Sequence, residues 1–186
     1  MALISGVERG FLPKDEVIER ICRIVAFLEA ADRFHGVFPH FMNGTTGKTI
    51  PFGERDDGGD LVETSFLMAG LLTARQWLIP VRPDLAARID RLWRHVEWSH
   101  HLRDDGALIW HFSPVHGFAM NHAITGWNEC LITHLLAAAS PTHPVPASTY
   151  HGSWAKGRDF LNGRDYGGVT LPLGPDYGGP LFFAHY

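Results

Sequence analysis

The stretch DLVETSFLMAGLLTARQWL, residues 60–78, decides the fold. Its pattern predicts a helix whose apolar side chains occupy nearly the whole circumference instead of one stripe. A helix that is apolar all round is buried all round, so other parts of the chain must cover it. The apolar residues that cover nearly every face of this helix are Leu61, Val62, Phe66, Leu67, Met68, Ala69, Leu71 and Leu72.

Three further helices are predicted, and they are of two kinds. Residues 14–32 and 83–102 are amphipathic, each with one apolar stripe and polar residues on the other faces. Residues 125–139 form a second helix that is apolar on nearly every face. The two amphipathic stripes consist of Val17, Ile21, Ile24, Val25 and Leu28, and of Leu85, Ile89, Leu92 and Val96.

Surface helices therefore alternate with buried helices along the chain. This alternation predicts an all-α, two-layer helical toroid in which outer helices shield inner ones. A four-helix bundle would instead show four similar amphipathic stripes. Residues 2–9 look like the end of an earlier inner helix, so about four barrel helices and a stub are expected. After a Pro-rich break, residues 146–154 suggest a short helix and residues 162–173 a glycine-turned β-hairpin.

The connections between helices also alternate in length. Residues 79–82 join a buried helix to a surface helix, whereas residues 33–59 and 103–123 form long loops that lead into buried helices. Long loops in compact domains are usually functional. Because both precede the N-terminal end of a buried helix, we expect them at the same end of the fold.

The composition excludes several classes of function. The formal net charge of -4 is spread along the chain, so no basic surface for nucleic acid is expected. No apolar run is long enough to cross a membrane, and the N-terminus shows no signal peptide. The two cysteines lie in apolar helical patterns and predict no disulfide. The sequence contains no zinc motif and no nucleophile elbow, so neither a metal nor any other cofactor is expected.

Aromatic and imidazole side chains are abundant, with six Trp, twelve Phe and twelve His. They suit a cleft for neutral polar ligands such as sugars, although a large aromatic core would have the same composition. Trp110, His111 and Phe112 are predicted to form a short strand in the second long loop. Together with Trp127 they form a candidate wall for stacking against sugars, and core packing is the alternative for at least two of them.

Glycoside hydrolysis needs a carboxylic acid that protonates the leaving oxygen and a second carboxylate. Glu129 is the strongest candidate for the acid, because it follows Trp127 and Asn128 in the run GWNEC at the predicted start of a buried helix. Asn128, like Trp127, is a candidate for binding the substrate. Partial desolvation there would raise the pKa of Glu129. Alternatively, Glu129 only complements the positive end of the helix dipole.

Acidic residues also precede the helix at residues 60–78, in the run DDGGD. Its glycines allow close approach of the backbone to a ligand, which makes Asp57 and Asp60 candidate binding residues. Asp60 and Glu63 also match a capping box, with Asp60 as N-cap. Asp57 has no such structural role and is otherwise a solvated loop residue.

Several long blocks of this sequence resemble the bacterial glucoamylase-like domain family, whose characterised members are endo-β-1,2-glucanases. The blocks are RFHGVFPHFMNGTTGKTIPF, DDGGDLVETSFLMAGLLTAR, LWRHVEWSHH, GWNECLITHLLAAASPTHPVP and YGGVTLPLGPDYGGPLFFAHY. The resemblance implies an (α/α)6 toroid, an inverting mechanism and a β-1,2-linked glucan as substrate. It implies that Glu129 is the general acid, that Asp57 and Asp60 line the sugar cleft, and that the location is periplasmic or secreted.

Family domains are about twice as long as this chain, so residues 1–186 are expected to form a single incomplete catalytic domain. The second catalytic carboxylate is expected in the other half. The alternative function is a non-catalytic carbohydrate-binding or structural half-toroid. Either way, we expect a homo-oligomer or association with the missing half, because the buried helices need neighbours on every side.

Overall fold

The computed structural model describes residues 1–171 and 173–175, and it is rich in helices, with short antiparallel strand pairs. The α-helices are α1 (Ala2–Glu8), α2 (Lys14–Ala30), α3 (Leu61–Leu78), α4 (Pro83–Arg94) and α5 (Leu131–Ala139). Shorter turns are the 3-10 helices η1 (Trp98–His101) and η3 (Arg158–Phe160) and the π-helix η2 (Tyr150–Trp154). The strands are β1 (Phe41–Met42), β2 (Thr49–Ile50), β3 (Gly59–Asp60), β4 (Leu108–Ile109), β5 (His111–Phe112), β6 (Ala123–Ile124), β7 (Arg164–Tyr166) and β8 (Val169–Leu171).

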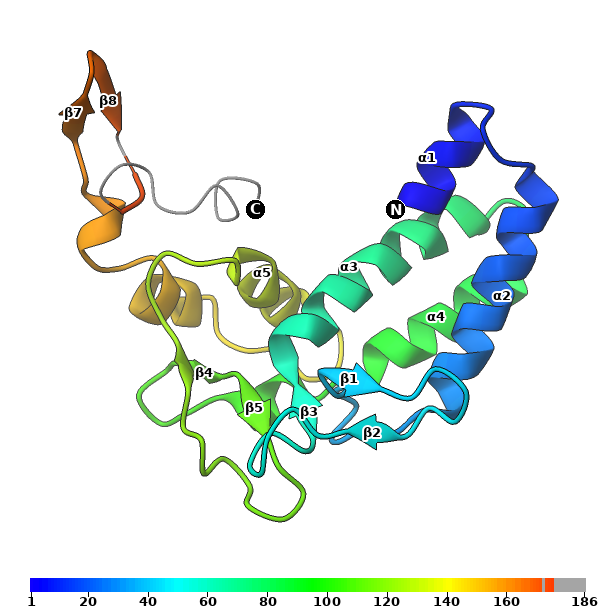
Figure 1. The fold of residues 1–186 in the computed structure, drawn as a ribbon, viewed down its shortest axis with the longest axis horizontal. Coiled ribbons are helices and arrows are strands. Elements are labelled where there is room, and N and C mark those ends of the chain that lie inside the picture. Colours follow the sequence, from blue (N-terminus) through cyan, green and yellow to red (C-terminus); the bar gives the residue numbers. More distant parts are fainter. Residues whose placement is uncertain (172, 176–186) are drawn as a thin grey trace.

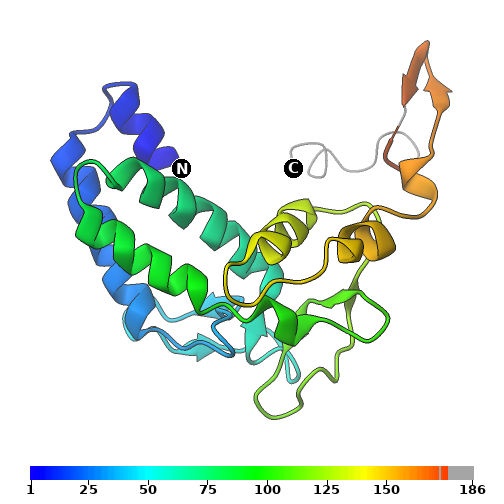
Figure 2. The same cartoon turned by 180° about the vertical axis from the view of Figure 1, so that it is seen from behind.

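Helix α3 lies at the centre of the helical layer. It packs along α4 and against α5, while α2 covers α4 from the outside (Figure 1). The view from behind shows α2, α3 and α4 running side by side, with α5 and η2 grouped next to them (Figure 2). The predicted apolar stripes are buried in this core, except that Ile24 on α2 is 39% exposed. The hairpin of β7 and β8 stands away from the helices (Figure 1). The antiparallel pairing of these two strands confirms the predicted glycine-turned hairpin.

The helix predicted over residues 83–102 is shorter than expected and ends at Arg94. The backbone leaves the helical path after Arg94. The amide of Glu97 donates its hydrogen bond to the carbonyl of His35, 3.0 Å away, instead of to a carbonyl within the helix. The chain then continues as η1. The long loop at residues 33–59 therefore decides where this helix stops.

The helix predicted over residues 125–139 begins only at Leu131. Gly126 adopts a left-handed backbone (φ 75°), which a regular helix does not allow. The side chain of Asn128 then accepts a hydrogen bond from the amide of Cys130 at 3.0 Å and supports the turn. Residues 125–130 thus form a turn that precedes α5.

The central helices are not covered on every side by the described residues. Phe66, Leu67 and Gly70 of α3 are partly exposed, and Leu135 of α5 is 53% exposed. Cavities of about 240 Å³ and 380 Å³ lie along this face, between α3 and the neighbouring α1, α2 and α5. Among the described residues, none of the helices is both long enough and apolar enough to cross a membrane.

Both cysteines are free thiols, as expected from their apolar surroundings. Cys22 is partly buried on α2, and Cys130 is fully buried at the N-terminal end of α5. Burial raises the pKa of the Cys130 thiol, and the negative charges of Glu129, Asp60 and Glu63 raise it further. Cys130 therefore behaves as a small buried apolar side chain.

Candidate functional site

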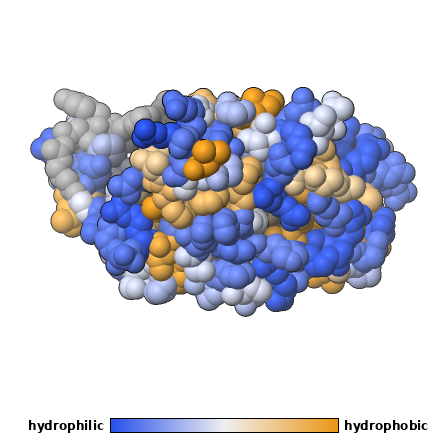
Figure 3. Space-filling model, turned by 90° about the horizontal axis from the view of Figure 1, so that it is seen from below, coloured by the Kyte–Doolittle hydropathy of each residue, from blue (hydrophilic) through white to orange (hydrophobic). Residues whose placement is uncertain are grey.

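The two long loops meet at the N-terminal end of α3. Strand β3 pairs with β5 so that Gly59 lies opposite Phe112 and Asp60 opposite His111. Strand β4 pairs with β6, which leads to the turn before α5. The expectation that both loops lie at one end of the fold is confirmed. Figure 3 shows this end from below, with apolar side chains visible between polar ones.

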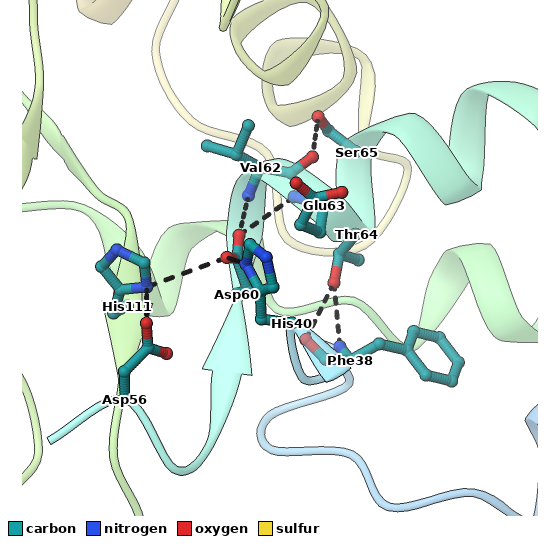
Figure 4. Close-up of polar contacts among 9 residues, drawn as sticks. All are labelled: Phe38, His40, Asp56, Asp60, Val62, Glu63, Thr64, Ser65 and His111. Carbon is teal, nitrogen blue, oxygen red and sulfur yellow. Dashed lines mark hydrogen bonds and ion pairs between the residues drawn. The ribbon is translucent and has the colours of Figure 1, made fainter. Parts of the chain in front are cut away.

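Asp60 caps α3 and is fully buried. One carboxylate oxygen, Oδ1, accepts hydrogen bonds from the amides of Val62 and Glu63, each at 3.0 Å. The other oxygen, Oδ2, lies 2.8 Å from Nδ1 of His40 (Figure 4). The predicted N-cap is confirmed, but the reciprocal half of a capping box is absent, because the Asp60 amide donates to the Phe38 carbonyl.

His111 lies between two buried carboxylates. Its Nδ1 is 3.4 Å from Oδ2 of Asp56 and 3.8 Å from Oδ2 of Asp60 (Figure 4). Neither contact has hydrogen-bond geometry, so this buried nitrogen has no such partner among the described residues. Burial lowers the pKa of His111, whereas the negative charges of Asp60 and Asp56 raise it. The neighbouring His122 and His40 lower it further. The net effect keeps the pKa of His111 below the usual value for a histidine.

Asp56 and His40 are members of this cluster that sequence reasoning missed. Asp56 is only 7% exposed, although it lies in a charged run that looks like a solvated loop. The sequence offers no signal that separates Asp56 from a solvated loop residue, because its burial depends on the contact with the distant His111. Asp57 is partly buried, and its Oδ1 has no partner among the described residues.

A cavity of about 530 Å³ opens beside this cluster. Trp110 forms part of its wall and stacks on His122, with ring centroids 5.0 Å apart and an angle of 20° between the planes. The aromatic surface and the buried polar groups together suit a ligand with alternating apolar and hydroxyl faces. The cavity is lined by His40, Phe52, Gly53, Glu54, Arg55, Asp56, Trp110, His111, Met120 and His122.

Glu129 lies in the turn before α5, not within a helix, and is half-buried. It lines the 380 Å³ cavity together with apolar residues of α3 and α5. Partial desolvation raises the pKa of Glu63, and the negative charges of Asp60 and Glu129 raise it further. The nearby His40 lowers this pKa. Glu63 thus lies within electrostatic range of both Asp60 and Glu129, so the three carboxylates gather at one end of the helices.

Trp127 and Asn128 support the turn that carries Glu129. Trp127 packs on Trp154 with a centroid distance of 6.1 Å, and it is not among the lining residues of the 530 Å³ cavity. The Oδ1 atom of Asn128 accepts a hydrogen bond from the Trp154 indole at 2.7 Å. Phe112 packs against Phe118 instead of joining Trp127. The predicted aromatic wall is therefore divided between two places.

Comparison with known proteins relates this chain to one family. Residues 121–186 match the family model described as "Putative glucoamylase". The chain is 43% identical to an exo β-1,2-glucooligosaccharide sophorohydrolase (non-reducing end) of Parabacteroides distasonis, over 100% of this chain and 29% of that protein.

Solved structures agree with this relation. An endo-β-1,2-glucanase from Chitinophaga pinensis, solved with sophorotriose and glucose, is 49% identical and superposes with a TM-score of 0.92, over 98% of this chain and 46% of that one. A putative glucoamylase from Bacteroides uniformis is 47% identical with a TM-score of 0.94, over 100% of this chain and 47% of that one. This chain therefore spans less than half the length of these relatives.

Proposed function

We propose that this chain, which is homologous over its length to one part of the glucoamylase-like glycoside hydrolases, contributes the loop-rich end of a β-glucan hydrolase. The reaction is endo-hydrolysis of β-1,2-glucan with inversion. Residues 1–186 supply part of a single (α/α)6 catalytic domain. Two of the relatives named above support this substrate, because their names refer to β-1,2-glucan or to β-1,2-glucooligosaccharide.

One observation carries the proposal: a cavity lined by the indole of Trp110 lies against the buried carboxylate of Asp56 and the imidazole of His111. Buried carboxylates without a cationic partner are costly, so they are retained where a reaction or a ligand uses them. Sugars offer hydroxyl groups to such carboxylates and an apolar face to an indole.

The roles follow from these positions. Glu129 acts as the general acid, since its half-buried carboxyl group lies beside apolar residues of α3 and α5. Trp110 and His111 bind the sugar in the 530 Å³ cavity. Asp57, Asp60, Trp127 and Asn128 are not among its lining residues, and we propose that they bind the sugar only where it extends beyond that cavity toward Glu129. The base in an inverting enzyme lies about 6.5–9.5 Å from the acid. We expect it in the part of the domain that the longer relatives possess.

A second candidate function is a non-catalytic carbohydrate-binding or structural half-toroid. The observation that favours it is the cavity next to Glu129, whose walls are Met1 and apolar residues of α3 and α5 and which is open to the surface. A general acid needs a closed, water-poor site to hold its proton at neutral pH. In this reading the chain binds glucan and does not turn it over, either alone or joined to the other half.

The test is hydrolysis of β-1,2-glucan by the chain alone and by the chain joined to the second half of a homologous domain. Glu129→Gln should lower the activity by about 10²–10⁴-fold with an unchanged melting temperature. Glu19→Gln, at an exposed position on α2, is the matched control and should keep full activity. NMR of the first products should show inverted anomeric configuration.

The outcomes separate the two candidates. Activity that falls with Glu129→Gln and not with Glu19→Gln supports the hydrolase. Glucan binding without turnover, in the joined form as well, supports the binding module. An active Glu129→Gln variant would reduce Glu129 to a residue that supports the end of α5.

A further inference from the structure

A second polar cluster lies away from the carboxylates of the candidate site, where the loop at residues 33–59 meets the segment after α4. Gly36 packs directly on the backbone of that segment: a Cβ atom there would come within 1.9 Å of the His95 carbonyl oxygen. The Glu97 amide donates to the His35 carbonyl at 3.0 Å. These contacts hold the backbones of His35 and Glu97 in a fixed relation.

Three side chains with metal-binding atoms converge at this junction. Nδ1 of His35 lies 3.0 Å from Oε2 of Glu97. The rings of His35 and His100 are stacked, with centroids 3.6 Å apart and an angle of 18° between their planes. One nitrogen or oxygen atom from each of the three residues lies within 4.8 Å of the others.

Two details distinguish this cluster from an ordinary surface pair. Nε2 of His100 is buried and has no hydrogen-bond partner among the described residues, which leaves a strong polar atom unsatisfied. His35 has a positive φ of 53°, a conformation that is uncommon for a residue with a side chain and is retained where the surroundings require it. Stacking two imidazoles also brings two groups together that would repel each other if both were protonated.

We propose that His35, Glu97 and His100 form a binding site for a divalent transition metal ion, with Zn²⁺ as the ion that fits best. Two imidazoles and one carboxylate are a common ligand set for zinc, with water in the fourth position. The same donors are poor ligands for Mg²⁺ and Ca²⁺, which prefer oxygen atoms. Sequence motifs do not reveal this site, because His35 and Glu97 are 62 residues apart.

Binding an ion requires two rearrangements of these side chains. Two ligand atoms of a tetrahedral zinc ion lie about 3.3 Å apart. The three ligand atoms lie within 4.8 Å of one another, so they have to approach by at most about 1.5 Å. The stacked rings must also splay so that their lone pairs converge. The side chain of His35 is exposed and would make this movement by giving up its stacking on His100.

A metal ion here would fasten the first long loop to the segment after α4. That loop carries His40 and Asp56, which belong to the candidate sugar site, but none of the three proposed ligands lines the 530 Å³ cavity. The ion would therefore have a structural role. The proposal does not depend on the glycosidase function, and each can fail without the other.

The experiment measures zinc binding by the full chain after removal of metal with a chelator. Calorimetry with ZnCl₂ should give one ion per chain, and a hundredfold excess over the dissociation constant should raise the melting temperature by about 5–10 °C. MgCl₂ at the same concentration should leave the melting temperature unchanged. The decisive variants are Glu97→Gln, which keeps the shape of the side chain, and His35→Ala at an exposed position.

Both variants should weaken zinc binding by at least tenfold while the far-ultraviolet circular dichroism stays that of the parent. His116→Ala is the matched control, because His116 is exposed and lies outside the cluster, and it should bind zinc like the parent. No zinc binding by the parent would overturn the proposal. It would equally be overturned by binding that survives in both variants, or by a Mg²⁺ effect equal to that of Zn²⁺.

Discussion

At the scale of single residues, Asp60 has two roles that one substitution can separate. Oδ1 caps α3, and Oδ2 faces His40 and His111. Asparagine caps a helix as well as aspartate does, but it carries no charge. Loss of the cap should therefore change the stability of the protein, whereas loss of the charge should change its affinity for sugar.

We predict that Asp60→Ala lowers the free energy of unfolding by about 1–2 kcal/mol, because the amides of Val62 and Glu63 lose their acceptor. Asp60→Asn should cost less stability and yet weaken the affinity for β-1,2-glucan oligosaccharides. Urea unfolding and calorimetric titration measure the two effects. If Asp60→Asn binds sugar like the parent, Asp60 serves the helix alone.

Buried histidines predict how stability depends on pH. Burial lowers the pKa of His134 to about 4, and it lowers the pKa of His101 to about 4 although the Ile109 carbonyl opposes the shift. Both groups take up protons more readily in the unfolded chain, where the pKa is about 6.5. Each histidine therefore makes its full contribution to the free energy of unfolding above about pH 6.5. This contribution, about 3 kcal/mol per histidine at most, is lost as the pH falls toward 4.

Measuring the free energy of unfolding between pH 4 and pH 7 tests this dependence. His134→Leu should flatten the slope, because it removes one of the two buried groups. His151→Ala, at an exposed position, should leave the slope as it is. A slope that is unchanged in His134→Leu would show that His134 is not a neutral buried group in the folded protein.

At the scale of secondary-structure elements, the turn before α5 depends on one amide side chain. Oδ1 of Asn128 accepts from both the Cys130 amide and the Trp154 indole. We predict that Asn128→Ala destabilises the protein by about 1–3 kcal/mol, because the buried indole is left without a partner. Asn128→Asp keeps the acceptor and should cost less. Equal losses in the two variants, measured by thermal unfolding, would show that the acceptor does not matter.

At the scale of the whole molecule, the apolar face along α3 and α5 predicts association. Monomers rarely expose contiguous apolar surface of more than a few hundred Å². We expect the chain to form dimers through this face unless the second half of a homologous domain covers it. Light scattering over a dilution series should show a mass that rises with concentration.

Leu135→Glu places a charge on this face and should shift the association toward monomer. Val115→Glu is the matched control, because Val115 is 74% exposed in the loop at residues 103–123, outside the apolar cavities. A chain that stays monomeric at all concentrations and binds no apolar dye would show that these helices need no further cover.

Local patterns in the sequence were enough to predict the existence and type of the helices, the N-cap at Asp60 and the hairpin at residues 162–173. These features depend on residues three or four apart, or on a tight turn, so short-range periodicity and capping chemistry describe them. The alternation of loop lengths also predicted that both long loops lie at one end, because consecutive helices run in opposite directions.

Only the tertiary structure decided where helices end and which side chains meet. α4 stops at Arg94 because the distant His35 takes the Glu97 amide, and α5 begins late because Gly126 and Asn128 form a turn. Asp56 and His111 are far apart in the sequence and meet only through the pairing of β3 with β5. Contacts of this kind depend on chain closure over tens of residues, which no local pattern records.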